Sequence, residues 1–334
     1  MSLIFQQLTF HHRLAHHIFI HDSQSSALRS TSPLISYTEF DLSLPFSRKL
    51  WDAKTAPQWK AIYLQEVPEI SSSIMSLATL LQDISSLSRI ARHADFELAA
   101  FASIHGISNM ISDCNRIFRG SSRQWSTVVA NLWQQELVQL LEQFEFLAVE
   151  PSKNSTPAIP LIYQTVSLSL YLPLGVLESF SGKDGPARSS AMYESFIQHI
   201  SPAHLRKASW HAGQVLRFAK SMPSGSLIAS RGTCVYFSAL ALWSLGTVFS
   251  LKGLTPEDES PGKETFFFLD GMGDNDALRR FTILGLGVPA LSSTGQPVHL
   301  EDRAAVMRLF QQLFSSEHGG WILDQQTRAL SHAF

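Results

Sequence analysis

The chain has 334 residues, of which 45% are hydrophobic, 10% aromatic and 16% charged, which excludes a disordered chain and allows a sizeable core. The formal net charge is −2 and no run of Lys or Arg occurs, which excludes a strongly basic nucleic-acid surface. The two cysteines, Cys114 and Cys234, exclude a disulfide framework or a cysteine zinc site and indicate a reducing compartment.

Apolar residues at helical spacing dominate the N-terminal half. Residues 3–20 predict a helix, and the polar stretch 23–36 predicts a loop. A further helical period begins near Ile70, breaks near Asp95 and is expected to be interrupted again at Gly106. The N-terminal residues lack a positively charged start and a long apolar core, so they are not a secretory signal.

Two loops are expected on composition, one near residues 151–160 and an acidic one near residues 255–264. Between them we expect a helix that contains Pro173, followed by a turn over 181–186. A final amphipathic helix is predicted to start near Glu301.

The rest of the chain is expected to wrap around a pair of helices. Ser201 and Pro202 suit the N-cap and first position of an amphipathic helix, which Pro223 ends. The next segment, 232–251, carries no charge at all, which predicts a central helix buried on every side. Its length equals that of a membrane span, but its Ser and Thr content and its few basic neighbours favour a core helix instead.

Strand patterns are nearly absent, and residues 266–269 are the best strand candidate. We therefore predict an all-α fold, a large multi-helix single domain over residues 1–334 with a central buried helix. No internal repeat is visible.

A group of histidines is the most catalytic-looking feature of the sequence. Two pairs stand four positions apart, a spacing that can grip a metal on one helix face. The Glu of the zinc-peptidase pattern is missing between them, so we expect no bound metal and keep a metal-dependent enzyme as the least favoured alternative. The histidines of this cluster are His11, His12, His16, His17 and His21.

Two glycine-containing stretches resemble ligand loops and fail in detail. Residues 270–276 begin like a calcium loop, but the sixth position is Asn275, so a helix N-cap at Asp274 or Asp276 is favoured. Residues 285–290 have dinucleotide-site spacing, yet Pro289 stands inside the motif and no helix is expected after it. No cofactor is expected.

Residues 13–59 resemble the fungal-specific transcription factor domain, the middle homology region of fungal zinc-finger regulators. Segments 209–223 and 269–291 are similar to the far end of such proteins, so the resemblance covers most of the chain. Phe46 stands where the family commonly has Cys after Leu-Pro. The residues that carry the signature are Arg13, Asp22, Pro33, Glu39, Leu44, Pro45, Leu50, Trp51 and Trp59.

The resemblance implies a nuclear, non-enzymatic transcription regulator whose partners are other regulators or a second copy of itself. Leu44, Leu50, Trp51 and Trp59 are then expected to be buried core anchors beside Pro45. The zinc module through which this family binds DNA has no match in the sequence. The chain is therefore expected to be the C-terminal part of a regulator, or a product without its DNA-binding half. By itself, the chain is expected not to bind a specific DNA sequence. It is also expected not to bind a membrane. A stand-alone interaction module is the main alternative.

Overall fold

The chain folds into two compact units, Met1–Ile159 and Pro160–Phe334, in a computed structural model. The expectation of one domain stays a prediction. Residues 151–155 of the expected loop at 151–160 and all of the loop at 255–264 lie outside the residues that the structure describes, and a helix already begins at Ala158. The described residues are 2–70, 75–91, 93–119, 127–149, 156–223, 230–253, 266–273 and 275–315.

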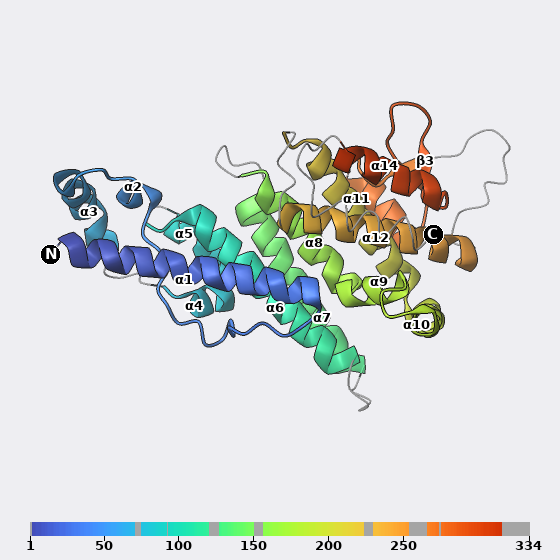
Figure 1. The fold of residues 1–334 in the computed structure, drawn as a ribbon, viewed down its shortest axis with the longest axis horizontal. Helices are drawn as coiled ribbons and strands as arrows, with labels where there is room; N and C mark the ends of the chain where they lie inside the picture. Colours follow the sequence, from blue (N-terminus) through green and yellow to red (C-terminus); the bar gives the residue numbers. More distant parts are fainter. Residues whose placement is uncertain are drawn as a thin grey trace. The chain divides into compact units, whose positions relative to one another are not determined.

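The described part of the first unit is helical (Figure 1). Its long helices α1, α6 and α7 pack in sequence, α1 on α6 and α6 on α7, and short helices fill the ends. The elements are α1 (Ser2–Arg29), α2 (Arg48–Trp51), α3 (Ala56–Ile70), α4 (Leu77–Gln82), η1 (Ile84–Ser86), α5 (Leu87–Ile90), α6 (Phe96–Arg119), α7 (Thr127–Phe144) and η2 (Glu145–Val149).

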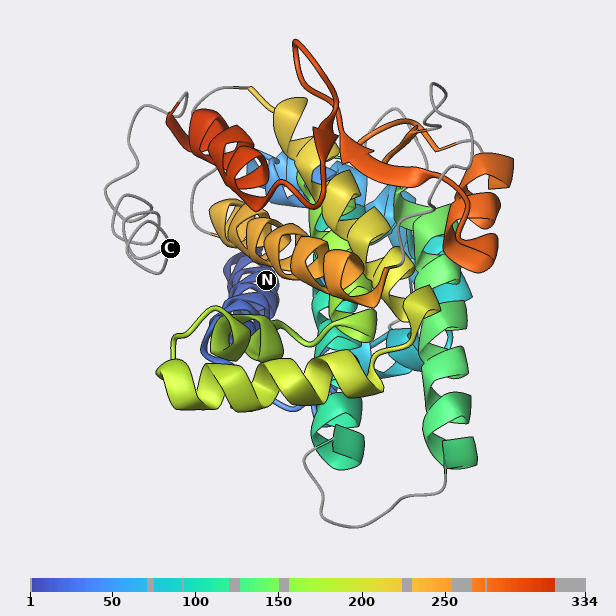
Figure 2. The same cartoon turned by 90° about the vertical axis from the view of Figure 1, so that its right-hand side faces the viewer.

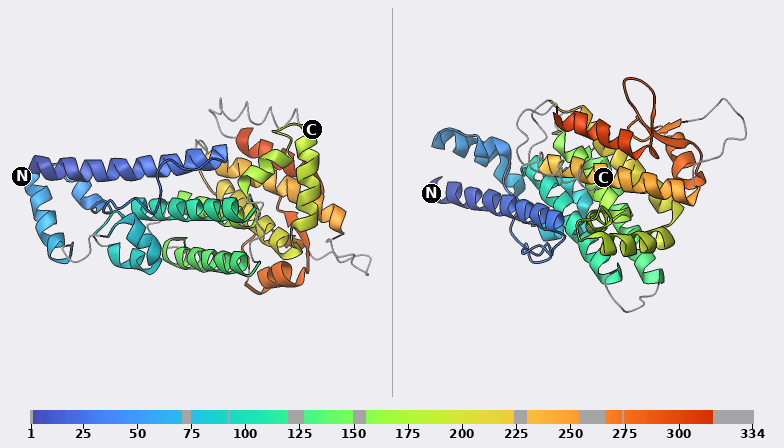
Figure 3. Two further views of the ribbon diagram at one scale, coloured as in Figure 1. Left: turned by 90° about the horizontal axis from the view of Figure 1, so that it is seen from below. Right: turned by 45° about the vertical axis from the view of Figure 1, so that its right-hand side comes forward.

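Helix α1 is longer than its sequence predicts, and it lies along α6 (Figure 3, left). The expected loop from residue 23 is wrong as far as Arg29, where the helix ends. The reason is that Ser23 is buried and its hydroxyl donates to the carbonyl of Phe19 at 2.9 Å, while Asn109 of α6 donates to Ser23 at 3.0 Å. Serine, which favours loops when exposed, is thus satisfied inside this helix.

Helix α6 begins after Asp95, where the sequence predicts a break, and runs through Gly106, where the sequence predicts an interruption. Asp95 directly precedes the helix, as expected. The helix continues through Gly106. Glycine is required at this position for packing, since a Cβ here would lie 2.6 Å from Cδ1 of Leu81. The glycine allows α4 to approach α6 closely, and helix geometry is kept.

The second unit is also mainly helical, so the all-α prediction is confirmed, with one small sheet added. Strand β1 pairs in parallel with β2, which pairs antiparallel with β3. The strand expected at 266–269 is thereby confirmed. The elements are α8 (Ala158–Tyr171), α9 (Leu174–Phe180), α10 (Pro186–His199), α11 (Pro202–Lys220), α12 (Ser230–Lys252), β1 (Phe266–Phe268), α13 (Asn275–Arg279), η3 (Arg280–Leu284), β2 (Val288–Leu291), β3 (Val298–His299) and α14 (Arg303–Ser315).

The uncharged helix α12 is the core of this unit, as the sequence predicts. It packs against α11, α9 and α14 (Figure 2), and 72% of its most apolar 18-residue stretch is buried. Among the described helices it alone is long and apolar enough to cross a membrane, and α8 with α9 passes that test only as a pair bent by 72°. Ser201 caps α11 by accepting from the backbone N–H of His204 at 3.1 Å, and Pro202 holds the first position, so this start is confirmed.

One predicted helix is broken. Pro173 stands between α8, which ends at Tyr171, and α9, which begins at Leu174. Because proline offers no N–H and restricts the residue before it, the chain bends there instead of continuing. The following turn is confirmed, and Gly182 and Gly185 supply its left-handed backbone with φ of +93° and +91°.

Candidate functional site

The signature residues of the first unit meet at an ion pair between α1 and the start of α6. Nη2 of Arg13 donates to Oδ2 of Asp95 at 2.5 Å, and the two side chains are only 12% and 3% exposed. The other carboxylate oxygen of Asp95 accepts from the backbone N–H of Leu98 at 3.1 Å. One carboxylate therefore caps α6 and binds α1 to it, at the helix end where negative charge is stabilised.

Trp51 lies over this ion pair and is not a buried anchor. The guanidinium carbon of Arg13 is 4.9 Å from the Trp51 ring centroid, and Phe10 stacks on the ring with centroids 6.4 Å apart. Trp51 is 43% exposed, so the expectation of burial is wrong. The reason is that α2 is a single turn, and Leu50, only 2% exposed, takes its inward position.

The Leu-Pro segment lies between two other stretches of the same unit. The carbonyl of Pro45 accepts from the N–H of Asp95 at 2.9 Å, and the N–H of Leu44 donates to the carbonyl of Met75 at 2.9 Å. Leu44 is buried, as expected. We call Arg13, Pro45, Leu50, Trp51 and Asp95 the signature node. Sequence reasoning found four of its members and missed Asp95, which it treated only as a helix break.

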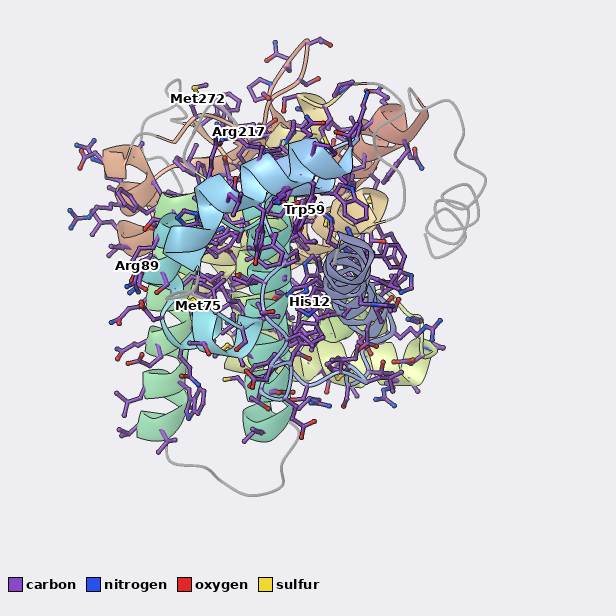
Figure 4. The ribbon with its side chains drawn as sticks, turned by 90° about the vertical axis from the view of Figure 1, so that its left-hand side faces the viewer. His12, Trp59, Met75, Arg89, Arg217 and Met272 are labelled. Carbon is purple, nitrogen blue, oxygen red and sulfur yellow. The ribbon has the colours of Figure 1, made fainter. Side chains whose placement is uncertain are left out.

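Trp59 is the buried tryptophan of the pair. It is 8% exposed on α3 (Figure 4) and stacks on Tyr63 with ring centroids 4.8 Å apart and planes 15° apart. Its expected burial is confirmed. Asp22, another signature residue, accepts from the backbone N–H of Ile35 at 2.9 Å, and Glu39 is exposed.

The histidine cluster divides into an inner and an outer set. His16 is fully buried, and its Nδ1–H donates to the carbonyl of His12 at 2.7 Å. Burial lowers the pKa of His16 to about 4 and also lowers the pKa of His12, whose Nδ1 lies 3.1 Å from the hydroxyl of Ser43. His11, His17 and His21 are exposed. Within the described ranges, no three His, Cys, Asp or Glu side chains are grouped to hold a metal ion.

Two further imidazoles, the buried His105 and the half-buried His211, had no signal in the sequence. His105 of α6 donates from Nδ1 to the carbonyl of Phe101 at 2.7 Å and accepts at Nε2 from Gln24 at 3.0 Å. His211 of α11 donates to Oε1 of Gln164 at 2.7 Å. Burial lowers the pKa of His105 to about 4 and that of His211 to about 3, so both are neutral packing groups at physiological pH.

The glycine-containing stretches of the second unit are structural. Asp270 accepts from Lys220 Nζ at 2.7 Å and from the N–H of Ser292 at 2.8 Å, so its carboxylate joins α11 to the chain after β2. Asp274, one expected N-cap, lies outside the described residues, and Asp276 is in the first turn of α13. Gly285 ends η3 and precedes β2. This order, helix then strand, is opposite to that of a dinucleotide site.

Comparison with known proteins agrees with the signature. Residues 8–142, which contain the whole node, match the fungal specific transcription factor domain. The chain is 23% identical over 86% of its length to a protein named as a transcription factor in Zymoseptoria tritici, and equally so to Transcription factor 1 of Elsinoe fawcettii. It covers 33% and 32% of these two relatives, about a third of their length. No solved structure matches. Residues 8–142 are therefore similar to the fungal specific transcription factor domain.

Proposed function

We propose that this chain is the non-enzymatic regulatory part of a fungal zinc-finger-type transcription regulator, acting in the nucleus through other regulators or a second copy of itself. The observation that carries the proposal is the signature node. Arg13 and Asp95 bind each other and the start of α6, so they are engaged in holding helices together. The match over residues 8–142 and the names of both relatives support the same class.

DNA recognition is assigned in this proposal to a module other than these residues. Non-specific DNA binding draws its free energy from cationic groups that displace counterions, and this chain has 26 Lys and Arg against 28 Asp and Glu. Its sequence also has no zinc-finger or zinc-cluster spacing. A stand-alone interaction module, which reaches promoters only through a DNA-binding partner, is the second candidate and shares this charge balance.

The test is a reporter experiment with the chain fused to an unrelated DNA-binding domain. The fusion is expected to change reporter transcription several-fold relative to the DNA-binding domain alone. Asp95→Ala, which breaks the node, should remove the effect. Glu97→Ala, which removes the exposed partner of Arg48 two positions away, should keep it. Reporter transcription that stays unchanged would contradict the proposal, provided that the wild-type fusion is present in the nucleus at the same level as the DNA-binding domain alone.

A further inference from the structure

The outer face of α1 carries an apolar stripe that nothing in the described part of the first unit covers. Phe10, Leu14 and Ile18 are 49%, 44% and 49% exposed, and they follow one another at four-residue steps on the face opposite α6. The buried residues of the same helix, His16 and Phe19, face the other way. The ring of Trp51, stacked on Phe10, extends the stripe at one end. We call Phe10, Leu14 and Ile18 the α1 stripe.

The α1 stripe has an unusual symmetry. Residues 10–18 read F-H-H-R-L-A-H-H-I, which is nearly the same in both directions about Leu14. Reversal exchanges Phe10 with Ile18, two large apolar residues. It also exchanges His11 with His17, which are exposed on either side of the stripe.

This symmetry is what an antiparallel contact between two identical helices requires. A two-fold interface uses the same patch on both copies, so the patch must complement its own reversed image. When Leu14 lies on the two-fold axis, each position i faces position 28−i of the other copy, and every apolar residue of the stripe meets an apolar residue.

The charge distribution also suits this contact, because few formal charges lie on the helix segment that would face the second copy. No Asp, Glu or Lys occurs between residues 10 and 21. Arg13, the one formal charge there, is only 12% exposed and is bound to Asp95.

Another exposed apolar surface, on α7, lacks this symmetry. Val128, Leu132 and Trp133 are exposed at 65%, 55% and 49%. Reversal about Leu132 would place Val128 against the exposed Glu136 of the second copy. Such a pairing desolvates a carboxylate without an opposite charge, which is unfavourable.

We propose that a second copy of this chain docks on the α1 stripe, antiparallel, with Leu14 at the two-fold axis and Phe10 of each copy against Ile18 of the other. The contact spans about 12 Å of helix, from the eight steps of ~1.5 Å between Phe10 and Ile18. It buries less than the ~800 Å² per partner of a standard interface, so dimerisation should depend on concentration in the micromolar range.

The experiment measures self-association of the full chain by sedimentation velocity from low to high micromolar concentration. The wild type should pass from monomer to dimer. Leu14→Glu brings two carboxylates together at the axis and should weaken dimerisation by at least about tenfold, equal to ~1.4 kcal/mol. The control is Leu132→Glu on α7, an equally large change at a similarly exposed leucine, which should leave dimerisation unchanged.

Charge substitution tests the antiparallel register. Phe10→Lys alone should weaken the dimer, and the double variant Phe10→Lys with Ile18→Glu should restore it, since each new lysine then faces a new glutamate of the other copy. A parallel contact would place like charges together in the double variant and stay weak. Thermal melts that match the wild type confirm that the half-exposed substitutions leave the fold intact.

Three results would overturn the proposal: a wild-type chain that stays monomeric over the whole range, a dimer that Leu132→Glu disrupts and Leu14→Glu does not, or a double variant that remains as weak as Phe10→Lys. Because sedimentation uses the purified chain alone, its failure leaves the reporter result untouched.

Discussion

Arg13 and Asp95 stand 82 positions apart in the chain, yet Nη2 of Arg13 lies 2.5 Å from Oδ2 of Asp95 in a contact nearly closed to solvent. The same carboxylate caps α6, and the ring of Trp51 covers the guanidinium. The first long helix is thereby fixed to the start of the second. Two residues that carry the resemblance, Arg13 and Trp51, are thereby brought into contact.

Breaking this pair should destabilise the first unit strongly. Asp95→Ala leaves the guanidinium of Arg13 buried without its partner and removes a helix cap, so we expect a loss of about 3–5 kcal/mol in the free energy of unfolding. Urea denaturation measures the loss. Glu97→Ala breaks the exposed pair with Arg48 and should cost no more than about 1 kcal/mol. Equal losses in the two variants would show that the buried pair is not a structural tie.

The two signature tryptophans should respond differently to truncation. Trp59→Ala removes a ring that is 8% exposed and stacked on Tyr63, so a loss of about 3–5 kcal/mol is expected. Trp51→Ala removes a ring that is 43% exposed, so its effect should be about half as large or less. Chemical denaturation of both variants gives the comparison. A larger effect at Trp51 would contradict its position on the surface.

Close packing around α12 should make the stability of the second unit sensitive to a side chain at one glycine. A Cβ at Gly246 would lie 2.0 Å from the carbonyl oxygen of Leu300, so Gly246→Ala must push the backbone before α14 away from the core helix. We expect a loss of about 1–3 kcal/mol, as for overpacked cores. Gly295 is the control, because a Cβ there would meet no atom within 4 Å and its backbone is not left-handed. Thermal unfolding of both alanine variants decides, and equal midpoints would refute the close approach.

Buried imidazoles should make the first unit sensitive to acid. The pKa of His16 and of His105 is about 4 in the folded chain, against an ordinary value of ~6.5 in the unfolded chain. Between these values the unfolded chain binds more protons, so stability is complete above about pH 6.5 and falls as the pH drops toward 4. Each group contributes a slope of up to about 1.4 kcal/mol per pH unit.

Urea midpoints measured across this pH range test the effect. His105→Leu should flatten the dependence by the slope of one group. A variant at His105 with the wild-type pH dependence would mean that this imidazole is protonated in the folded chain.

Local signals in the sequence are sufficient to predict much of the fold. Ser201 and Pro202 mark the start of α11, and the lack of charge over 232–251 identifies the core helix, because both depend on neighbours in the chain. Helix α1 extends beyond its predicted end, since the serines that suggest a loop are satisfied by buried partners that only the fold supplies.

Four of the five residues of the signature node are predictable from the sequence, but Asp95 and the geometry of the node are not. Leu44, Leu50 and Trp59 are buried as their apolar character suggests. The exposure of Trp51 depends on the single-turn length of α2, and the role of Asp95 depends on a contact across 82 positions. Neither relationship leaves a periodic pattern in the sequence.

We propose that this chain influences transcription through proteins and not through direct selection of DNA. The most direct measurement titrates the purified chain against genomic fragments at physiological salt, with competitor DNA present. We expect weak binding that is the same for all fragments and disappears as the salt concentration rises, because Lys and Arg do not outnumber Asp and Glu. Submicromolar binding to one fragment that resists the competitor would contradict it.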